Sequence, residues 1–303
     1  MRRSPRLLSI APPAVSPGEG SKPAETKGNK ADGEASEGKP GRRGRTGKDG
    51  PVGKPRDFDE VWATVTQLRA IRDAPVDTMG CHMLTDSEAA PEDRRFQLLV
   101  AVMLSSQTKD QENAKAMHNL HAYFKGKGGL TRKNLAAMEE RELDAQIKGV
   151  GFHNTKTRNL IRVANLLEDC FHGKVPDTME GLLSLPGVGP KMAVLVMEVG
   201  HGRRDAGICV DTHVHRIAAM LGWTKDAKTP EATRQQLEAR LPVEVWPDVN
   251  LLLVGLGQMI QQRPFDLLQR CIKCTDPVAA FRLVGRIGGN LKVIDKATGD
   301  SIL

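Results

Sequence analysis

Apolar residues recur at helical spacing along most of the chain from residue 57 onward. The first predicted helix, near 57–75, begins at an Asp57-x-x-Glu60 capping pattern, and one face carries Phe58, Val61, Trp62, Val65, Leu68 and Ile71. Further helices are predicted at 94–105, 109–124, 140–147, 155–171, 178–184, 190–200, 212–221, 230–239 and 245–261. Because the alternating pattern of strands is nearly absent, we predict an all-α fold of many short helices joined by short loops.

Residues 1–56 lack this periodicity. They are rich in Gly, Pro, Ser, Lys and Glu, and the first aromatic residue of the chain is Phe58, so we predict a disordered basic tail. The tail holds 13 Lys and Arg against 6 Asp and Glu, whereas residues 57–303 hold 31 of each sign. The net charge of +7 therefore belongs to the tail, and a prediction of DNA binding must rest on local motifs.

The tail also carries possible address signals. Its first eighteen residues contain three arginines and no acid, which is typical of a mitochondrial transit peptide. The cluster Arg42-Arg43-Gly44-Arg45 fits a nuclear address or a loose DNA contact, and a solvated linker is the third interpretation. We expect a nuclear and mitochondrial protein. The longest apolar run, residues 98–104, is too short to span a membrane, so membrane roles are excluded.

A glycine-rich turn at 185–191 reads Leu-Pro-Gly-Val-Gly-Pro-Lys. Gly187 and Gly189 leave bare backbone amides just before Pro190, which favours the first turn of a helix, so a phosphate can sit on that helix's N-terminus. Such hairpins clamp the DNA backbone without reading sequence. Gly187, Val188 and Gly189 are therefore candidate DNA-binding residues.

Lys191, at the end of this turn, is a candidate nucleophile. We expect the helix dipole and partial burial to lower its pKa, and a neutral amine can attack a sugar C1′ to give a Schiff base. Asp211 is its candidate partner, as proton acceptor or as stabiliser of a cationic sugar, and it is also placed to cap the helix at 212–221. His213 and His215 do not share a helical face, so DNA contact or packing is favoured over metal binding.

These patterns resemble the endonuclease III DNA glycosylases, within the helix-hairpin-helix superfamily. The resemblance covers residues 57 to about 258 and rests on four motifs in the family's order, at 104–110 (LSSQTKD), 149–156 (GVGFHNTK), 185–191 and 210–213 (VDTH). It implies two helical domains flanking a DNA-binding cleft. One would be a helical barrel, 95–211, that carries the hairpin, and the other would combine 57–94 with 212–280, followed by an atypical C-terminal tail at 281–303.

The resemblance also implies a bifunctional enzyme of base excision repair. It would excise oxidised pyrimidines of the thymine glycol type from duplex DNA and cleave the abasic site by β-elimination, with Lys191 as Schiff-base nucleophile and Asp211 as its partner. The damaged nucleotide must be flipped out of the stack. Gln107, on a turn before a Thr108-x-x-Gln111 capping pattern, and Phe152 match the family's gap-filling and wedging positions. Ordinary packing is the alternative for Phe152.

The C-terminal cysteines depart from the family. Its 4Fe-4S cluster uses Cys-x6-Cys-x2-Cys-x5-Cys, and Cys271 and Cys274 would be the inner pair, but the outer positions hold Pro264 and Ala280. We therefore expect neither this cluster nor another cofactor, and Cys271 and Cys274 alone make only half of a metal site. Cys81, Cys170 and Cys209 are expected to be unpaired core thiols.

Two rival functions remain open at this point. A monofunctional glycosylase such as the related adenine-mismatch enzymes would place a small hydroxyl residue where Lys191 stands, and a non-catalytic DNA-binding module would use the hairpin alone. We expect the partner to be double-stranded DNA with damaged pyrimidines or abasic sites. Repair proteins could bind the tail, and the chain is expected to be a monomer with no membrane partner.

Overall fold

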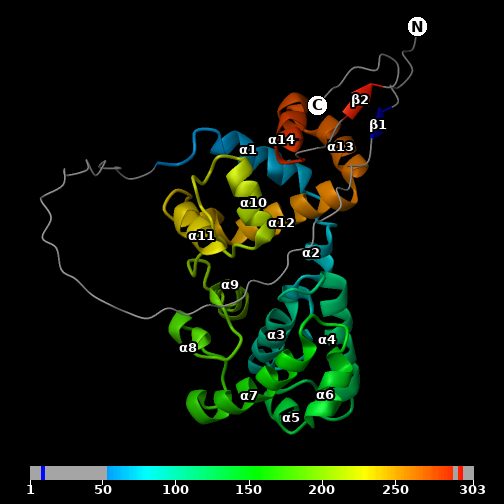
Figure 1. Cartoon of the computed structure of the whole chain (residues 1–303), viewed down its shortest axis with the longest axis vertical. Helices are drawn as coiled ribbons and strands as arrows, with labels where there is room; N and C mark the ends of the chain where they lie inside the picture. The colour runs from blue at the N-terminus through cyan, green and yellow to red at the C-terminus, as the bar shows by residue number, and fades with distance from the viewer. Residues whose placement is uncertain (1–7, 11–52, 289–292, 296–303) are drawn as a thin grey trace, which may run out of the picture. The chain divides into compact units, whose positions relative to one another are not determined.

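The computed structural model describes residues 8–10, 53–288 and 293–295, and its helical content confirms the predicted all-α class (Figure 1). The helices are α1 (Phe58–Leu68), α2 (Pro75–Met79), α3 (Pro91–Ser105), α4 (Asp110–Phe124), α5 (Arg132–Ala136), α6 (Glu140–Ile147), α7 (His153–Phe171), α8 (Met179–Leu183), α9 (Pro190–Leu195), α10 (Thr212–Met220), α11 (Pro230–Glu238), α12 (Trp246–Gln262), α13 (Pro264–Lys273) and α14 (Pro277–Gly288). Short 3-10 helices, η1 (Cys81–Met83) and η3 (Val243–Val245), and a π-helical turn, η2 (Val196–Gly200), complete the helical part. None of the described helices is both long and apolar enough to cross a membrane.

Two short strands were not predicted. β1 (Leu8–Ile10) pairs antiparallel with β2 (Val293–Asp295), with Leu8 opposite Asp295. These strands belong to a unit separate from the helices, so they are described by themselves. Apart from β1, the predicted tail lies outside the described residues as far as residue 52.

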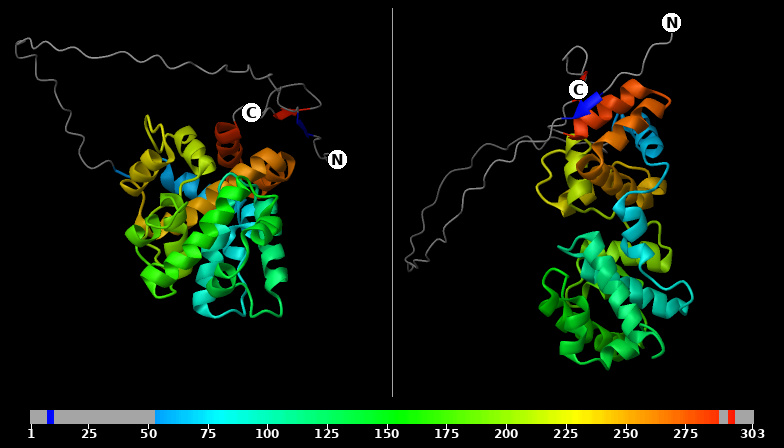
Figure 2. Two further views of the ribbon diagram at one scale, coloured as in Figure 1. Left: turned by 60° about the horizontal axis from the view of Figure 1, so that its bottom comes forward. Right: turned by 90° about the vertical axis from the view of Figure 1, so that its right-hand side faces the viewer.

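The first apolar core forms around α3. Its residues 98–104 are all buried, which explains why the sequence shows an uninterrupted apolar run there instead of a helical stripe. Helices α4, α7 and α9 pack directly on α3, and α5 and α6 pack on α7 (Figure 2). Val188 of the hairpin belongs to the same core as Leu104 at the end of α3.

A second group of buried side chains surrounds α12, which packs against α1, α10, α13 and α14. The guanidinium of Arg69 is fully buried there and pairs with Asp77, at 2.6 Å. A Cβ on Gly255 would lie 2.1 Å from Nη2 of Arg69, so only glycine lets the buried arginine approach the helix. Both cores lie in one compact unit that runs from Gly53 to the end of α14, and the predicted division at 95–211 remains a prediction.

The C-terminal end differs from the sequence analysis. Helices α13 and α14 were not predicted, and α14 runs through the expected start of an atypical tail at 281, with Leu283, Val284 and Ile287 buried. Asp57 is the N-cap residue of α1, as the pattern predicted, but the expected side-chain bond is absent. Its side chain makes no cap bond but accepts from Nη1 of Arg286 on α14, at 2.7 Å, because a charged tertiary partner outcompetes the local amides.

Candidate active site

The glycine turn is built for contact through its backbone. Gly187 adopts φ +84° and is exposed, and a Cβ there would lie 2.7 Å from Nδ2 of Asn159. Val188 is buried in the core, and its amide donates to the carbonyl of Leu185, at 3.1 Å. Of the three predicted DNA-binding residues in the turn, Gly187 and Gly189 therefore present backbone to solvent, whereas Val188 anchors the turn.

Lys191 lies on the first turn of α9, directly after the hairpin. Solvent reaches its side chain, yet protein surrounds it densely enough that burial is the largest single influence on its pKa. Burial lowers the pKa, but the negative charges that Cys209, Asp211, Cys81 and Asp110 can carry outweigh it and leave the pKa raised. The prediction of a lowered pKa is therefore wrong, because sequence does not show which acids surround the amine.

Cys209 packs beside Lys191. Burial raises the pKa of its thiol to about 12, so at neutral pH it is uncharged and the carboxylates Asp211 and Asp110 carry the local negative charge. Its Sγ donates to the carbonyl of Lys191, at 3.8 Å, and its own carbonyl accepts from Nδ2 of Asn250, at 2.8 Å. These contacts hold the segment that leads to Asp211 against α9 and α12.

Asp211 is the N-cap of α10, which confirms the predicted capping role. Its Oδ1 accepts from the amide of Val214, at 2.8 Å. Within the described residues the second carboxylate oxygen makes no hydrogen bond, so capping occupies one oxygen and leaves the other available to Lys191. The charge of Asp211 raises the pKa of Lys191, although no hydrogen bond or ion pair joins the two side chains within the described residues.

A second carboxylate, Asp110, lies close enough to raise the pKa of Lys191 and was not among the predicted site residues. It is the first residue of α4, and its Oδ2 accepts from Nε2 of Gln258 on α12, at 2.7 Å. An acid two residues after Thr108 was the available signal. The sequence alone does not show that α12 orients it.

Gln107 and Phe152 lie on adjoining turns. Both adopt the left-handed conformation, with φ +49° and +56°, and both are exposed, Phe152 to 66%. A Cβ on Gly151 would lie 2.4 Å from the carbonyl oxygen of Gln107, so the two turns touch. The alternative that Phe152 packs inside the protein is wrong, and a large exposed aromatic at this position fits insertion into DNA.

Two other predictions about this region change. The capping pattern at Thr108 is wrong, because α4 begins at Asp110 and the Thr108 hydroxyl instead accepts from the amide of Gly151, at 3.1 Å. The ring of His213 is half-buried, and its Nδ1 would lie 2.6 Å from a Cβ on Gly257 of α12. Packing thus accounts for His213, and its contact with DNA stays a prediction.

The C-terminal cysteines do not fit an iron–sulfur cluster. Cys271 is fully buried in α13, and Sγ of Cys274 donates to the carbonyl of Arg270, at 3.5 Å. Pro264 begins α13 and Ala280 is fully buried in α14, and neither side chain can ligate iron. Among the described residues, no group of three or more His, Cys, Asp or Glu is arranged to hold a metal ion.

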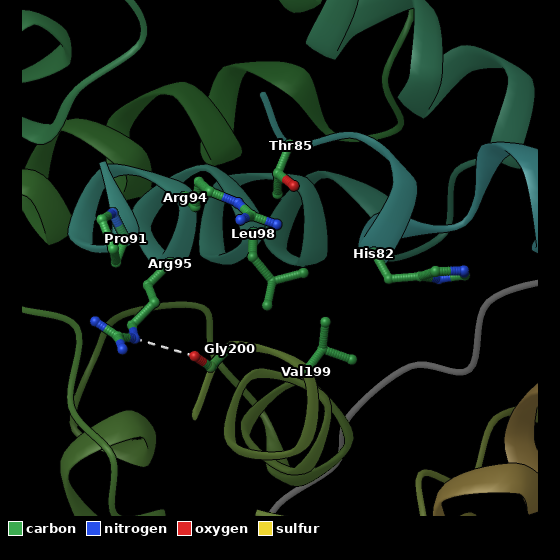
Figure 3. Close-up of a pocket in the computed structure, with 8 residues that line it drawn as sticks. All are labelled: His82, Thr85, Pro91, Arg94, Arg95, Leu98, Val199 and Gly200. Carbon is green, nitrogen blue, oxygen red and sulfur yellow. Dashed lines mark hydrogen bonds between the residues drawn. The ribbon is translucent and has the colours of Figure 1, made fainter. Parts of the chain in front are cut away.

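A hollow of about 260 Å³ lies between α3 and the π-helical turn (Figure 3). It is lined by His82, Thr85, Pro91, Arg94, Arg95, Leu98, Val199 and Gly200, and Nε of Arg95 donates to the carbonyl of Gly200, at 3.0 Å. Pro91, Arg94 and Arg95 lie in the N-terminal part of α3, away from Gln107, and Val199 and Gly200 end the helix that Lys191 begins. At about 1.5 Å per helical residue, the hollow is separate from the candidate active site.

Comparison with known proteins agrees with this geometry. The family described as "HhH-GPD superfamily base excision DNA repair protein" matches residues 100–243. Endonuclease III-like protein 1 of Mus musculus is 43% identical over 73% of this chain and 72% of its own length. The chain belongs to the endonuclease III family. The Bos taurus protein of the same name is 43% identical over 74% of this chain and 71% of its own length.

Solved structures of endonuclease III share the fold. A trapped covalent intermediate of endonuclease III with DNA has a TM-score of 0.57 and 26% identity and covers 73% of this chain and 93% of that chain. A non-covalent endonuclease III–DNA complex has a TM-score of 0.57 and 25% identity and covers 74% and 94%. The predicted helix-hairpin-helix glycosylase fold is confirmed.

Proposed function

We propose that this endonuclease III family member is a bifunctional DNA glycosylase and AP lyase of base excision repair. The observation that carries the proposal is the position of Lys191, an amine at the start of the helix after the hairpin, with Asp211 and Asp110 around it. The endonuclease III relatives at 43% identity support the same activity.

The chemistry follows from the amine's charge. Because the pKa of Lys191 is raised, the amine must first lose a proton, and Asp211 has a carboxylate oxygen to accept it. Nζ then attacks C1′, the glycosidic bond breaks, and its electron pair leaves with the base, which gains a proton. Opening of the C1′–O4′ bond gives the iminium, and O4′ takes up a proton.

Strand cleavage uses the same intermediate. The iminium acidifies C2′, so a base can remove a C2′ proton while the C3′–O bond breaks and the 3′ phosphate departs. Water then adds to C1′ of the iminium and regenerates the Lys191 amine. In this scheme Asp211 accepts the Lys191 proton and passes it to the departing base, which restores the carboxylate that stabilises the cationic sugar.

We further propose that the substrates are oxidised pyrimidines of the thymine glycol type in duplex DNA. The exposed Gln107 and Phe152 pair supports a mechanism in which the lesion leaves the stack and side chains fill the gap. The bare amides of Gly187 and Gly189 provide contacts to phosphate that do not depend on sequence.

Borohydride trapping tests the proposal. The protein is mixed with a duplex that carries thymine glycol or an abasic site, and the reduced covalent adduct is measured. We expect an adduct that Lys191→Gln abolishes and that the control Lys228→Gln, an exposed loop residue, retains. Base release without an adduct would indicate a monofunctional glycosylase. DNA binding without release would leave only a non-catalytic binding module.

Localisation and protein partners remain proposals that rest on the tail. We propose entry into both nucleus and mitochondrion, because the N-terminal arginines and the cluster at 42–45 resemble the two kinds of address. Fluorescent fusions of the full chain, with Arg2, Arg3 and Arg6 replaced by Gln, should lose the mitochondrial signal alone. We also propose a monomer that recruits repair proteins through the tail, which sedimentation and tail-dependent pull-down would check.

A further inference from the structure

Lys156 is a buried lysine that the catalytic mechanism does not use. It lies one helical turn after Phe152 on α7 and is only 7% exposed. Its Nζ donates to the carbonyls of Leu104, at 2.8 Å, and Ser106, at 2.5 Å, and to the Thr108 hydroxyl, at 3.2 Å. Among the described residues no carboxylate pairs with it.

The three acceptors flank one residue. Leu104 and Ser106 precede Gln107 and Thr108 follows it, so a single ammonium closes the turn that carries Gln107. The Thr108 hydroxyl also accepts from the amide of Gly151, the residue before Phe152. Lys156 is therefore joined to both turns, to one by its side chain and to the other by the backbone of α7.

Such a burial is costly. An ammonium that leaves water without a carboxylate partner loses hydration that three neutral acceptors only partly replace. Burial correspondingly lowers the pKa of Lys156 to about 8. Left-handed backbone at Gln107 and Phe152 adds further strain, since neither residue is glycine. Strain and a buried charge concentrated at one place are typical of functional sites.

We propose that Lys156 is a positioning residue that locks Gln107 and Phe152 together, so that both side chains enter the DNA stack as one unit when the lesion is extruded. The proposal rests on the proposed function. Lys156 acts on the opening of the duplex and not on the Schiff base, because its side-chain contacts lie at the end of α3 and in the turn that carries Gln107. Loss of Lys156 should therefore slow reactions that require base extrusion and spare those that do not.

The test compares two substrates under single-turnover conditions. One is thymine glycol in a fully paired duplex, and the other is an abasic site in a single strand, where no stack needs to be opened. We expect Lys156→Met to slow excision from the duplex about tenfold or more and to change trapping on the single strand by less than about twofold. The control Lys133→Met, an exposed residue of α5, should match the wild type on both.

A second readout reports the step directly. The fluorescence of 2-aminopurine placed opposite the lesion should rise when wild-type protein binds, and this rise should shrink with Lys156→Met. If melting shows that Lys156→Met does not fold, Thr108→Val takes its place, because it removes one acceptor from Lys156 and the partner of the Gly151 amide. Thr108→Val should likewise slow excision from the duplex and leave trapping on the single strand unchanged.

Equal loss on both substrates, or no loss on either, would overturn the positioning role. Failure of the proposed function has a different signature, because the wild type itself would then trap neither substrate.

Discussion

Nε2 of Gln258 donates to Oδ2 of Asp110, at 2.7 Å, while Oε1 of the same side chain accepts from the amide of Val76, at 2.9 Å. One amide group on α12 thereby joins α2 to the first turn of α4. The carboxylate that it orients helps to raise the pKa of Lys191. Residues remote from the hairpin in sequence thus set the charge of the nucleophile.

Asp110→Asn should make the amine of Lys191 easier to deprotonate. The substitution removes a negative charge that raises the pKa of Lys191 but keeps an oxygen for Gln258. The acid limb of Schiff-base trapping on an abasic duplex should therefore move to lower pH. The measurement is the trapping rate against pH for both proteins. A limb that stays in place would show that Asp110 does not act on Lys191.

Gln258→Met should destabilise the protein by about 1–3 kcal/mol, because the amide of Val76 and the carboxylate of Asp110 both lose a partner in a buried region. Unfolding in urea gives the free energy. Gln258→Glu is the matched variant, since it keeps an acceptor for Val76 but sets a second carboxylate against Asp110. No measurable loss of stability in Gln258→Met would contradict this explanation.

Gly255→Ala should destabilise the protein by about 3 kcal/mol or more, because the new Cβ collides with the buried Arg69 guanidinium and disturbs its ion pair with Asp77. Thermal melting and urea unfolding measure the loss. Gly189→Ala is the control for stability, since a Cβ there meets nothing within 4 Å. Similar losses from both substitutions would argue against the collision.

Glu198 should make stability fall as pH rises toward neutrality. Burial, aided by Asp248 and opposed by Arg204, raises the pKa of this carboxyl from 4.5 to about 7. A raised folded-state pKa contributes stability that is present below 4.5 and is lost as pH rises through about 7. As pH rises from 4.5 to about 7, the free energy of unfolding of the wild type should fall by about 1–3 kcal/mol relative to that of Glu198→Gln. Melting of both proteins across this range checks it, and parallel curves would refute it.

The sequence was most informative where local patterns decide structure. Helical periodicity predicted α3, α4, α7 and α12 closely, because the buried faces of these helices carry apolar side chains at regular spacing. It failed at α13 and α14, because residues 212–280 were assigned to a helical domain without a helix predicted after residue 261, and 281–303 were expected to form a tail. The side-chain cap bonds expected at Asp57 and Thr108 are absent because Arg286 and Gly151, distant in sequence, offer stronger or better-placed partners.

For the candidate active site too, the sequence predicted some features and missed others. Lys191 and Asp211 were found from motifs, because each stands at the start of a helix after a recognisable turn, whereas Gln107 and Phe152 were found through the resemblance to the endonuclease III family. The direction of the Lys191 pKa, the place of Asp110 and the contacts of Lys156 were not, since they depend on segments that meet only in the folded chain. The need for glycine at 255 and 257 was also not predictable from sequence, because it arises from the side chains of Arg69 and His213, which pack against these positions in the fold.

The shared burial of Val188 and Leu104 sets a distance on the DNA. Val188 fixes the turn that offers its amides to a phosphate, and Leu104 fixes the end of the helix that leads to Gln107, and both are packed into one apolar core. Because such cores are close-packed and resist compression, they hold the turn at Val188 and the end of the helix before Gln107 at a fixed separation. In the proposed complex with DNA, this fixed separation would select which nucleotide's sugar lies at Lys191, whatever the bases around it.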